Sequence, residues 1–388
     1  MKRKVLKALD LICFYIYNRI GAIFMPLEEN QVLFLTEARS DLDGNLKAMY
    51  DYIAKTKPQY EAVVFVKADR RNRDSFGRRM EIYKALTTSK YVFLDDFYGI
   101  TSTMKVRKEQ KLVQLWHGSG AFKKFGFSRV SAGESLKGVH TGYRKYTDVA
   151  VTAEPVRECF AEAFDVALSR VRAMGSPRTD IFFDREKSEQ VRSRLEETYP
   201  ELVGKKLVLI APTYRGKKVQ DANYDFDRLH LDNICDALGE EYVVGVKWHP
   251  AIKNNINIGK IELSLDERIM DFTDYAEIND LLVVTDVLVT DYSSVIFDYY
   301  LLEKPIVYFA YDLDKYDGGR GFYFDFREYL FGSEADNYES LVECIKSGDL
   351  CEDKRKAFGD KFMKACDGRS CEKVAEWIFG EETADGSK

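Results

Sequence analysis

Nine short apolar runs, each followed by a longer stretch with helical spacing, constrain the fold of this chain more than any other feature. The runs are nearly continuous in Val, Ile and Leu, which is typical of parallel strands that helices cover on both faces. Two series of such runs predict two doubly wound, Rossmann-like α/β domains. The runs lie at 31–36, 62–66, 90–96, 112–116 and 148–152, and then at 206–213, 241–247, 285–290 and 305–310.

The boundary between the two series is marked by MGSPRTD at 174–180, whose Gly, Ser and Pro indicate a linker. A chain of 388 residues has the length of two domains. We therefore expect an N-terminal domain at 28–174 and a C-terminal domain at 175–388. The segment 1–27 precedes both and differs from them in composition.

Residues 1–27 place four Lys and Arg side chains among the first seven residues, ahead of a run rich in Leu, Ile, Phe and Tyr. Asp10, Asn18 and Arg19 interrupt the run, so it falls short of the roughly 18 uninterrupted apolar residues of a membrane span. The pattern predicts an amphipathic helix on an anionic membrane surface. A helix packed on its own domain fits the same pattern.

Charge and cysteine usage exclude several classes of protein. The formal net charge of −6 argues against a nucleic-acid partner. Seven Cys without a C-x-x-C pair indicate reduced thiols rather than a disulfide framework or a zinc ribbon. The D-x-D pairs at 41–43, 225–227 and 312–314 do not clearly follow buried strands, and phosphate-binding or dinucleotide-binding glycine motifs are missing. We expect no metal and no cofactor.

Ligands of doubly wound sheets bind beyond the carboxyl ends of the strands. Four of the runs end in residues that suit a phosphate group. In chain order these ends are His117-Gly118-Ser119-Gly120, Thr213-Tyr214-Arg215-Gly216, Lys247-Trp248-His249 and Tyr292-Ser293-Ser294.

Several of these residues have two interpretations. His117 is a candidate general base, or a histidine that caps a strand by hydrogen bonding. Lys247 and His249 share one face of an extended strand, so both could point into a cleft. Arg178, in the turn GSPRT, and Arg215 suit bidentate phosphate binding, although either alone could be a surface residue.

Six motifs in order resemble the CDP-glycerol glycerophosphotransferase family, the teichoic acid primases and polymerases. The resemblance covers residues 30–365 and implies a GT-B fold with the two domains facing a cleft. It also implies transfer of an alditol phosphate from a CDP-alditol to an acceptor hydroxyl, with release of CMP. The motifs are WHGSGAFKKFG, GSPRTD, APTYR, KWHP, VTDYSSVIFDY and KPIVYFAYDLDKY…RGFYFDF.

The resemblance also implies roles for individual residues. His117 would deprotonate the acceptor hydroxyl, and His249, helped by Lys247, would neutralise the departing diphosphate oxygens. Gly118 and Ser119 would lie in the same pocket, and Arg215 is our addition from charge and placement. Positions that would hold the CDP-alditol are Arg178, Pro212, Thr213, Ser293, Ser294 and Asp298.

Family members of this kind are peripheral proteins of the cytoplasmic membrane face that act on an undecaprenyl-diphosphate-linked acceptor. CDP-glycerol is the expected donor, and CDP-ribitol is the alternative, because the WHGSG loop departs from the WHGTP or WHAAG of many members. Primase, single-addition enzyme and polymerase remain open. A GT-B glycosyltransferase that uses a UDP-sugar is a more distant alternative, and a membrane-associated scaffold without activity is another.

Overall fold

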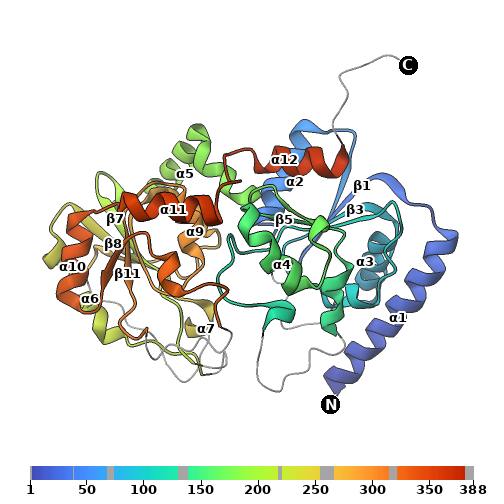
Figure 1. Ribbon diagram of the computed structural model, residues 1–388, viewed down its shortest axis with the longest axis horizontal. Coiled ribbons are helices and arrows are strands. Elements are labelled where there is room, and N and C mark those ends of the chain that lie inside the picture. The colour runs from blue at the N-terminus through green and yellow to red at the C-terminus, as the bar shows by residue number, and fades with distance from the viewer. Residues whose placement is uncertain are drawn as a thin grey trace. The chain divides into compact units, whose positions relative to one another are not determined.

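The computed structural model describes residues 2–37, 39–67, 74–129, 139–216, 221–253, 266–313 and 321–380. The chain forms two compact units, each around its own sheet (Figure 1). Unit 1 comprises Met1–Asp180 together with the chain from Lys364 onward, and unit 2 comprises Ile181–Met363. Part of the sixth family motif, residues 314–320, lies outside the described residues.

The sheet of unit 1 has the strand order β2-β1-β3-β4-β5-β6, with every neighbouring pair parallel. This order reverses between β1 and β3, which makes their carboxyl ends the expected ligand crevice. The strands are β1 (Glu28–Leu35), β2 (Glu61–Phe65), β3 (Ser89–Leu94), β4 (Lys111–Gln114), β5 (Asp148–Val151) and β6 (Val171–Ala173).

The sheet of unit 2 has the order β12-β11-β10-β7-β8-β9, again with parallel neighbours. Its order reverses between β7 and β10, as in a dinucleotide-binding sheet. The strands are β7 (Lys206–Ile210), β8 (Tyr242–Val246), β9 (Ile269–Asp271), β10 (Thr285–Thr290), β11 (Ile306–Phe309) and β12 (Ser333–Ala335). All nine expected runs are strands, and the prediction of two doubly wound parallel sheets is confirmed.

Helices cover both sheets. In unit 1 they are α1 (Lys2–Phe24), α2 (Gly44–Thr56), α3 (Phe76–Thr88), α4 (Arg157–Phe164) and α12 (Ser370–Phe379). In unit 2 they are α5 (Arg185–Thr198), α6 (Leu231–Leu238), α7 (Pro250–Lys253), α8 (Ile278–Val284), α9 (Val295–Tyr300), α10 (Tyr338–Ser347) and α11 (Glu352–Phe362). Short 3₁₀ turns that matter below are η1 (Gly99–Thr103), η2 (Gly126–Ser128) and η6 (Pro177–Phe183).

The last helix belongs to unit 1, whereas we expected residues 175–388 to form one domain. Val374, Ala375 and Ile378 of α12 join the core that α2 makes with the first sheet (Figure 1). The Asp180 carboxylate accepts hydrogen bonds from the backbone N–H groups of Ser370 (2.9 Å) and Cys371 (2.8 Å). A carboxylate at a helix start satisfies amides that have no partner within the helix. The apolar face of α12 and this anchor explain why the chain returns to unit 1.

Helix α1 accounts for most of the segment 1–27, for which we expected a helix, and it runs beside α3 (Figure 1). Phe14, Asn18 and Gly21 are buried, and the Asn18 amide donates to Thr87 Oγ1 at 3.2 Å. One face of α1 thus packs on its own domain, which was the alternative to a helix on a membrane surface. Among the described residues, no helix combines the length and the hydropathy needed to cross a bilayer.

Candidate active site

His117 follows β4 at the carboxyl edge of the first sheet. Trp116 before it has φ 56°, a left-handed conformation that is uncommon for a bulky residue and clusters at functional sites. The turn leaves the His117 side chain 44% exposed. Its Nδ1 atom lies 3.2 Å from the backbone oxygen of Asp95 and 3.7 Å from Oδ1 of Asp96, two residues that follow β3.

This geometry fixes the tautomer of His117. A backbone carbonyl can only accept a hydrogen bond, so Nδ1 carries the hydrogen and Nε2 keeps its lone pair when the ring is neutral. Desolvation by the surrounding protein lowers the pKa of His117, the Asp96 carboxylate acts to raise it, and Arg178 acts to lower it. The net lowering keeps the imidazole neutral at pH 7, as a general base requires.

Asn45, at the start of α2, connects the His117 loop to the Arg178 turn. Its Nδ2 group donates to the backbone oxygen of Trp116 at 2.7 Å, and its Oδ1 atom accepts from the Arg178 N–H at 2.9 Å. Arg178 in turn donates from Nη1 to the backbone oxygen of His117 at 2.8 Å. Arg178 was expected in the C-terminal domain, but it lies in the part of η6 that belongs to unit 1, with its side chain beside His117.

The glycine loop differs from its expected role. We expected the amides after His117 to enter a helix and to cradle an anion, but between the end of β4 and Arg129 the 3₁₀ turn η2 is the only helical element. Gly118 is half-buried and Ser119 is buried. Gly120 has φ 66°, and its N–H donates to Thr152 Oγ1 at 3.1 Å. This amide therefore braces the loop against the residue that follows β5.

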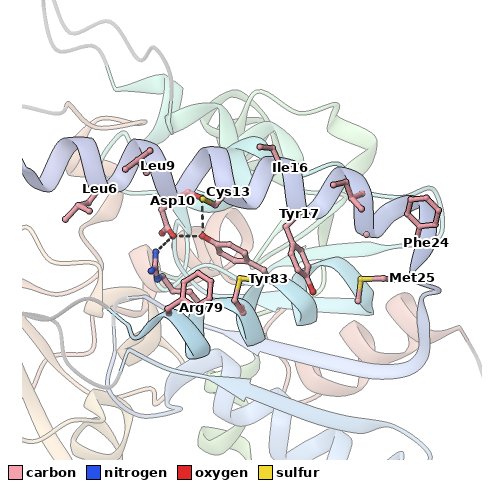
Figure 2. Close-up of a pocket in the computed structure, with 14 residues that line it drawn as sticks. Leu6, Leu9, Asp10, Cys13, Ile16, Tyr17, Phe24, Met25, Arg79 and Tyr83 are labelled. Carbon is pink, nitrogen blue, oxygen red and sulfur yellow. Dashed lines mark hydrogen bonds and ion pairs between the residues drawn. The ribbon is translucent and has the colours of Figure 1, made fainter.

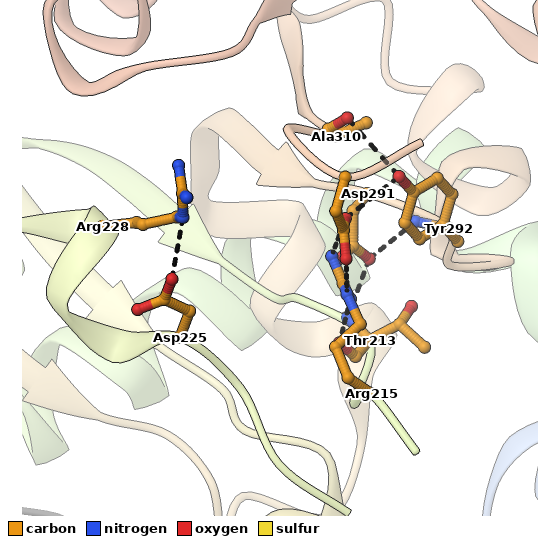
Figure 3. A network of polar contacts seen from close by, with 8 residues as sticks. Thr213, Arg215, Asp225, Arg228, Asp291, Tyr292 and Ala310 are labelled. Atoms are coloured by element: carbon orange, nitrogen blue, oxygen red, sulfur yellow. Dashed lines mark hydrogen bonds and ion pairs between the residues drawn. The ribbon is translucent and has the colours of Figure 1, made fainter. Parts of the chain in front are cut away.

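Arg215, beyond β7, is the centre of a buried ion-pair network at the carboxyl edge of the second sheet (Figure 3). Its Nε and Nη2 groups bind the two carboxylate oxygens of Asp312 at 2.6 and 2.8 Å. Its Nη1 group donates to Asp291 Oδ2 at 2.8 Å and to the Thr213 backbone oxygen at 2.6 Å. The guanidinium also lies within 5.6 Å of the ring centres of Tyr224, Tyr292 and Tyr311.

This network gives Arg215 a structural role that its sequence position did not indicate. Burial acts to lower the pKa of Arg215, but hydrogen bonds and charges from Asp312 and Asp291 outweigh it and raise the pKa. We expected Arg215 to contact phosphate, and the structure instead commits four of its hydrogen bonds to the protein. Arg215 thereby ties together the ends of β7, β10 and β11.

Asp291 orders the loops that hold Thr213 and the serines. Its Oδ1 atom accepts from the N–H groups of Thr213 (2.8 Å) and Tyr292 (2.6 Å), while its other oxygen binds Arg215 (Figure 3). Pro212 is buried and Thr213 is half-buried beside it. Because β7 and β10 flank the reversal of strand order, Asp291 lies at the point where ligands of such sheets bind.

The serine turn leads into α9. The Ser293 hydroxyl accepts a weak hydrogen bond from the Val295 N–H at 3.4 Å, and Ser294 occupies the cap position without a side-chain capping bond. Both serines are half-buried. Asp298, which we expected to hold substrate hydroxyls, is 1% exposed and lies inside unit 2. In this structure the serines are more accessible to a ligand than Asp298 is.

Lys247 and His249 follow β8 and differ in exposure. The Lys247 ammonium group donates to the backbone oxygens of Phe272 (3.2 Å) and Tyr275, so it braces the neighbouring loop. Desolvation lowers the pKa of Lys247, although the charges of nearby carboxylates act to raise it. His249 is exposed, and its Nδ1 atom accepts from the Ala251 N–H at 3.0 Å. Its neutral form therefore carries the hydrogen on Nε2, where it can be donated.

The expected residues therefore fall into two groups, one at the carboxyl edge of each sheet. Sequence reasoning missed the residues that position them, namely Asn45, Asp95, Asp96, Asp291 and Asp312. Four of these are acidic residues close behind a strand, so the strand-end rule could have found them. Within the described residues, no three His, Cys, Asp or Glu side chains converge in a way that could hold a metal ion.

Comparison with known proteins gives a consistent result. Residues 17–380 match the family model for CDP-glycerol:poly(glycerophosphate) glycerophosphotransferases. The chain is 38% identical over 354 residues to the teichoic acid poly(ribitol-phosphate) polymerase of Bacillus spizizenii. This alignment covers 91% of this chain and 57% of that protein. The chain is also 32% identical over 375 residues to the teichoic acid ribitol-phosphate primase of the same species, covering 93% and 94% of the two chains.

The chain thus spans less than two thirds of the length of the polymerase and nearly all of the primase. Among solved structures, the wall teichoic acid polymerase TagF superposes with a TM-score of 0.78 at 22% identity, over 97% of this chain and 96% of that chain. This likeness confirms the expected GT-B type of fold.

Proposed function

The chain belongs to the CDP-glycerol:poly(glycerophosphate) glycerophosphotransferase family, and from this premise we propose that it transfers an alditol phosphate from a CDP-alditol to a hydroxyl of a lipid-linked acceptor. The observation that carries the proposal is the state of His117. Its ring is exposed at a strand end and held by Asp95, with a lowered pKa and Nε2 unprotonated.

In the proposed reaction, His117 Nε2 takes the proton of the acceptor hydroxyl as its oxygen attacks the β-phosphorus of the CDP-alditol. The new O–P bond forms while the bond between the β-phosphorus and the bridging oxygen breaks, and CMP leaves with the bonding electrons. Such transfers depend on positioning and charge neutralisation more than on covalent catalysis. Arg178 next to His117 supplies one positive charge on the same edge.

We assign the donor to unit 2. His249 can donate from Nε2 to a diphosphate oxygen, and the half-buried Ser293, Ser294 and Thr213 supply hydroxyl groups. The Arg215–Asp291–Asp312 network holds these loops in place without itself contacting the donor. Lys247 supports the His249 loop through the Phe272 and Tyr275 carbonyls. The reaction as proposed uses no metal ion, and unchanged rates in a chelator would support that part.

The sequence motifs predict glycerol as the alditol. The relatives favour ribitol as a second candidate, because the polymerase and the primase reported above both carry ribitol phosphate in their names. Competition between CDP-glycerol and CDP-ribitol in one reaction, resolved by mass, distinguishes the two donors.

We also propose that the protein is peripheral to the cytoplasmic membrane face, through α1. Six apolar side chains line the outer face of this helix, each at least half exposed: Val5, Leu9, Ile12, Ile16, Ile20 and Ile23. They recur at about 3.6 residues, the period of a straight helix, rather than the 3.5 of a coiled coil. A straight apolar stripe beside a basic N-terminus suits a flat anionic surface better than a partner helix.

A donor panel tests the activity. The full chain is incubated with CDP-glycerol, CDP-ribitol and several UDP-sugars, together with a short lipid-linked acceptor, and release of CMP or UDP is measured. CMP release with growth of the acceptor supports the proposal, and product length reports primase or polymerase behaviour. Turnover of UDP-sugars alone would favour a glycosyltransferase, and no turnover at all would favour a scaffold.

A further inference from the structure

A groove of about 600 Å³ runs between α1 and α3 in unit 1 (Figure 2). Leu6, Leu9, Ile16 and Phe24 line it from α1, and Phe76 and Met80 line it from α3. Its volume lies within the range of about 300–1,000 Å³ that is usual for sites of organic ligands. None of the strand-end residues assigned to the reaction lines this groove.

The chemistry of the lining selects an apolar occupant. Asp10 and Arg79 are the only charged side chains that line the described groove, and they pair with each other at 2.8 Å (Figure 2). The Tyr83 hydroxyl donates to the Asp10 carboxylate and to the Asp10 backbone oxygen. These polar groups satisfy one another, while Phe76 is 71% and Phe24 78% exposed to water. A hydrocarbon chain would cover this apolar surface without displacing a hydrogen bond.

The groove leads towards the edge of unit 1 that carries His117. Asp10 pairs with Arg79 and Asn18 with Thr87, so α1 runs parallel to α3, whose end leads into the start of β3; α1 therefore runs opposite to the parallel strands β1 and β3. At about 1.5 Å per helical residue and about 3.3 Å per strand residue, α1 is longer than β1. Leu6 therefore lies towards the carboxyl edge of the sheet, where the chain places Asp95, Asp96 and His117.

Charge agrees with this direction. Lys7 lies near the start of α1, at the end of the helix near that edge. Burial raises the pKa of Glu37, which follows β1, and the positive charges of Lys67 and then Lys7 act to lower it. Lys7 is thus within electrostatic range of the carboxyl edge. The lining of the groove is mainly apolar, and Lys7, next to Leu6 in the chain, adds positive charge at the end of α1 near this edge.

We propose that this groove holds the hydrocarbon chain of the acceptor lipid, with the diphosphate of that lipid at the basic end of α1. The assignment rests on the proposed function for the identity of the acceptor. Leu9, Ile16 and Ile20 belong both to the groove and to the outer stripe of α1. A chain could therefore pass from a bilayer under the stripe into the groove without crossing water.

Binding of farnesyl diphosphate, a soluble diphosphate with an apolar chain, tests the groove by calorimetry on the full chain. Met80→Trp fills the groove from α3 and leaves the stripe of α1 unchanged. Val203→Trp, at a 60% exposed position in unit 2, is the matched control. We expect Met80→Trp to weaken binding at least about tenfold, the effect of losing the burial of roughly one side chain, and Val203→Trp to bind as the wild type does.

A second variant guards against misfolding. Phe76→Ser removes one wall at an exposed position, so the fold should tolerate it, and it should also weaken binding about tenfold. Wild-type affinity in Met80→Trp and Phe76→Ser, or binding of farnesyl diphosphate no tighter than inorganic diphosphate, would overturn the proposal. Dissociation of a dimer by Met80→Trp in sedimentation would also overturn it and assign the groove to a second copy.

Transfer assays separate this proposal from the proposed function. With a long-chain acceptor, Met80→Trp should raise KM while kcat is retained, and with a chain-free acceptor analogue it should match the wild type. An equal loss with both acceptors would overturn the groove assignment. If the wild type transfers nothing from any CDP-alditol but farnesyl diphosphate binding still depends on Met80, then the proposed function fails and the groove remains a lipid-chain site.

Discussion

His117 and Asp96 follow neighbouring strands of one sheet, and their Nδ1 and Oδ1 atoms lie 3.7 Å apart. The carboxylate favours the protonated imidazole, whereas desolvation and Arg178 oppose it. Desolvation is the largest influence on the pKa of His117, and Asp96 and Arg178 act on that pKa in opposite directions. If His117 is the base, substitution of Asp96 and substitution of Arg178 should shift the acidic limb of the pH–rate profile in opposite directions.

The first prediction concerns these two neighbours. Asp96→Asn removes the influence that raises the His117 pKa, so the acidic limb of kcat/KM should shift to lower pH. Arg178→Gln removes a positive charge, so the same limb should shift to higher pH. Profiles measured with each variant check the signs. Shifts of both variants in the same direction would contradict the assignment of His117 as the titrating base.

Removing the imidazole is the second prediction. His117→Ala should lower kcat by about 10²–10⁴-fold, the usual contribution of a general base, while binding of the CDP-alditol by calorimetry stays near that of the wild type. His230→Asn is the matched control, because His230 has φ 41° and Asn tolerates that conformation. Full activity of His117→Ala would remove this residue from the mechanism.

The third prediction concerns the buried ion pair of Arg215. The Arg215 side chain is 13% and the Asp291 side chain 1% exposed, so Arg215→Met leaves a carboxylate uncompensated in the interior. Unit 2 should lose about 3–5 kcal/mol of unfolding free energy. Denaturant titration with a probe in unit 2 measures the loss. Arg185→Met breaks an exposed pair with Glu189 and should change stability by less than about 1 kcal/mol.

Asp95 provides a fourth prediction, with a defined pH dependence. Burial raises its pKa to about 6, although Arg39 acts to lower it. Between about pH 4 and pH 6 this carboxyl group is ionised in the unfolded chain but still protonated in the folded chain. The free energy of unfolding therefore falls as the pH rises through this range. The resulting cost at pH 7 is about 3 kcal/mol for a shift of about 2 pH units.

Asp95→Asn removes that cost and keeps the backbone oxygen that holds His117. Its unfolding free energy should exceed that of the wild type at pH 7, and the difference should vanish near pH 4. Urea titrations at both pH values measure it. A constant difference across this range would mean that Asp95 does not titrate as described.

The sheets were predictable because their central strands are continuous apolar runs, a strong local signal. Strands β6, β9 and β12 were missed because each has only three residues and no apolar run, and they form by pairing at the sheet edges. The return of α12 to unit 1 depends on Asp180 and on a core assembled from residues far apart in sequence. Local patterns contain no signal for such a contact.

The position of His117 at the edge of the sheet was predictable because it follows an apolar run directly, whereas contacts with distant residues were not. The ion pairs of Arg215 were not predictable, because its carboxylate partners lie 76 and 97 residues further along the chain. The hydrogen bonds of Lys247 were not predictable either, because alternation along a strand does not indicate which backbone oxygens its ammonium group will reach. Charge type and strand position indicated the edge of the sheet, whereas the pairing of these charges depends on residues far apart in sequence.

The last prediction separates membrane docking from packing of α1. Ile12 and Ile23 are 55% and 73% exposed on the outer stripe and do not line the groove. The double variant Ile12→Gln/Ile23→Gln should keep the thermal midpoint of the wild type and bind anionic vesicles at least about tenfold more weakly, because two buried side chains would be lost from the lipid. Phe14→Ala, at a fully buried position facing Tyr83, should instead lower stability by about 3–5 kcal/mol. Vesicle sedimentation at low and high salt, beside thermal unfolding, measures both effects. Equal vesicle binding by the double variant and the wild type would show that the membrane contact lies elsewhere on the molecule.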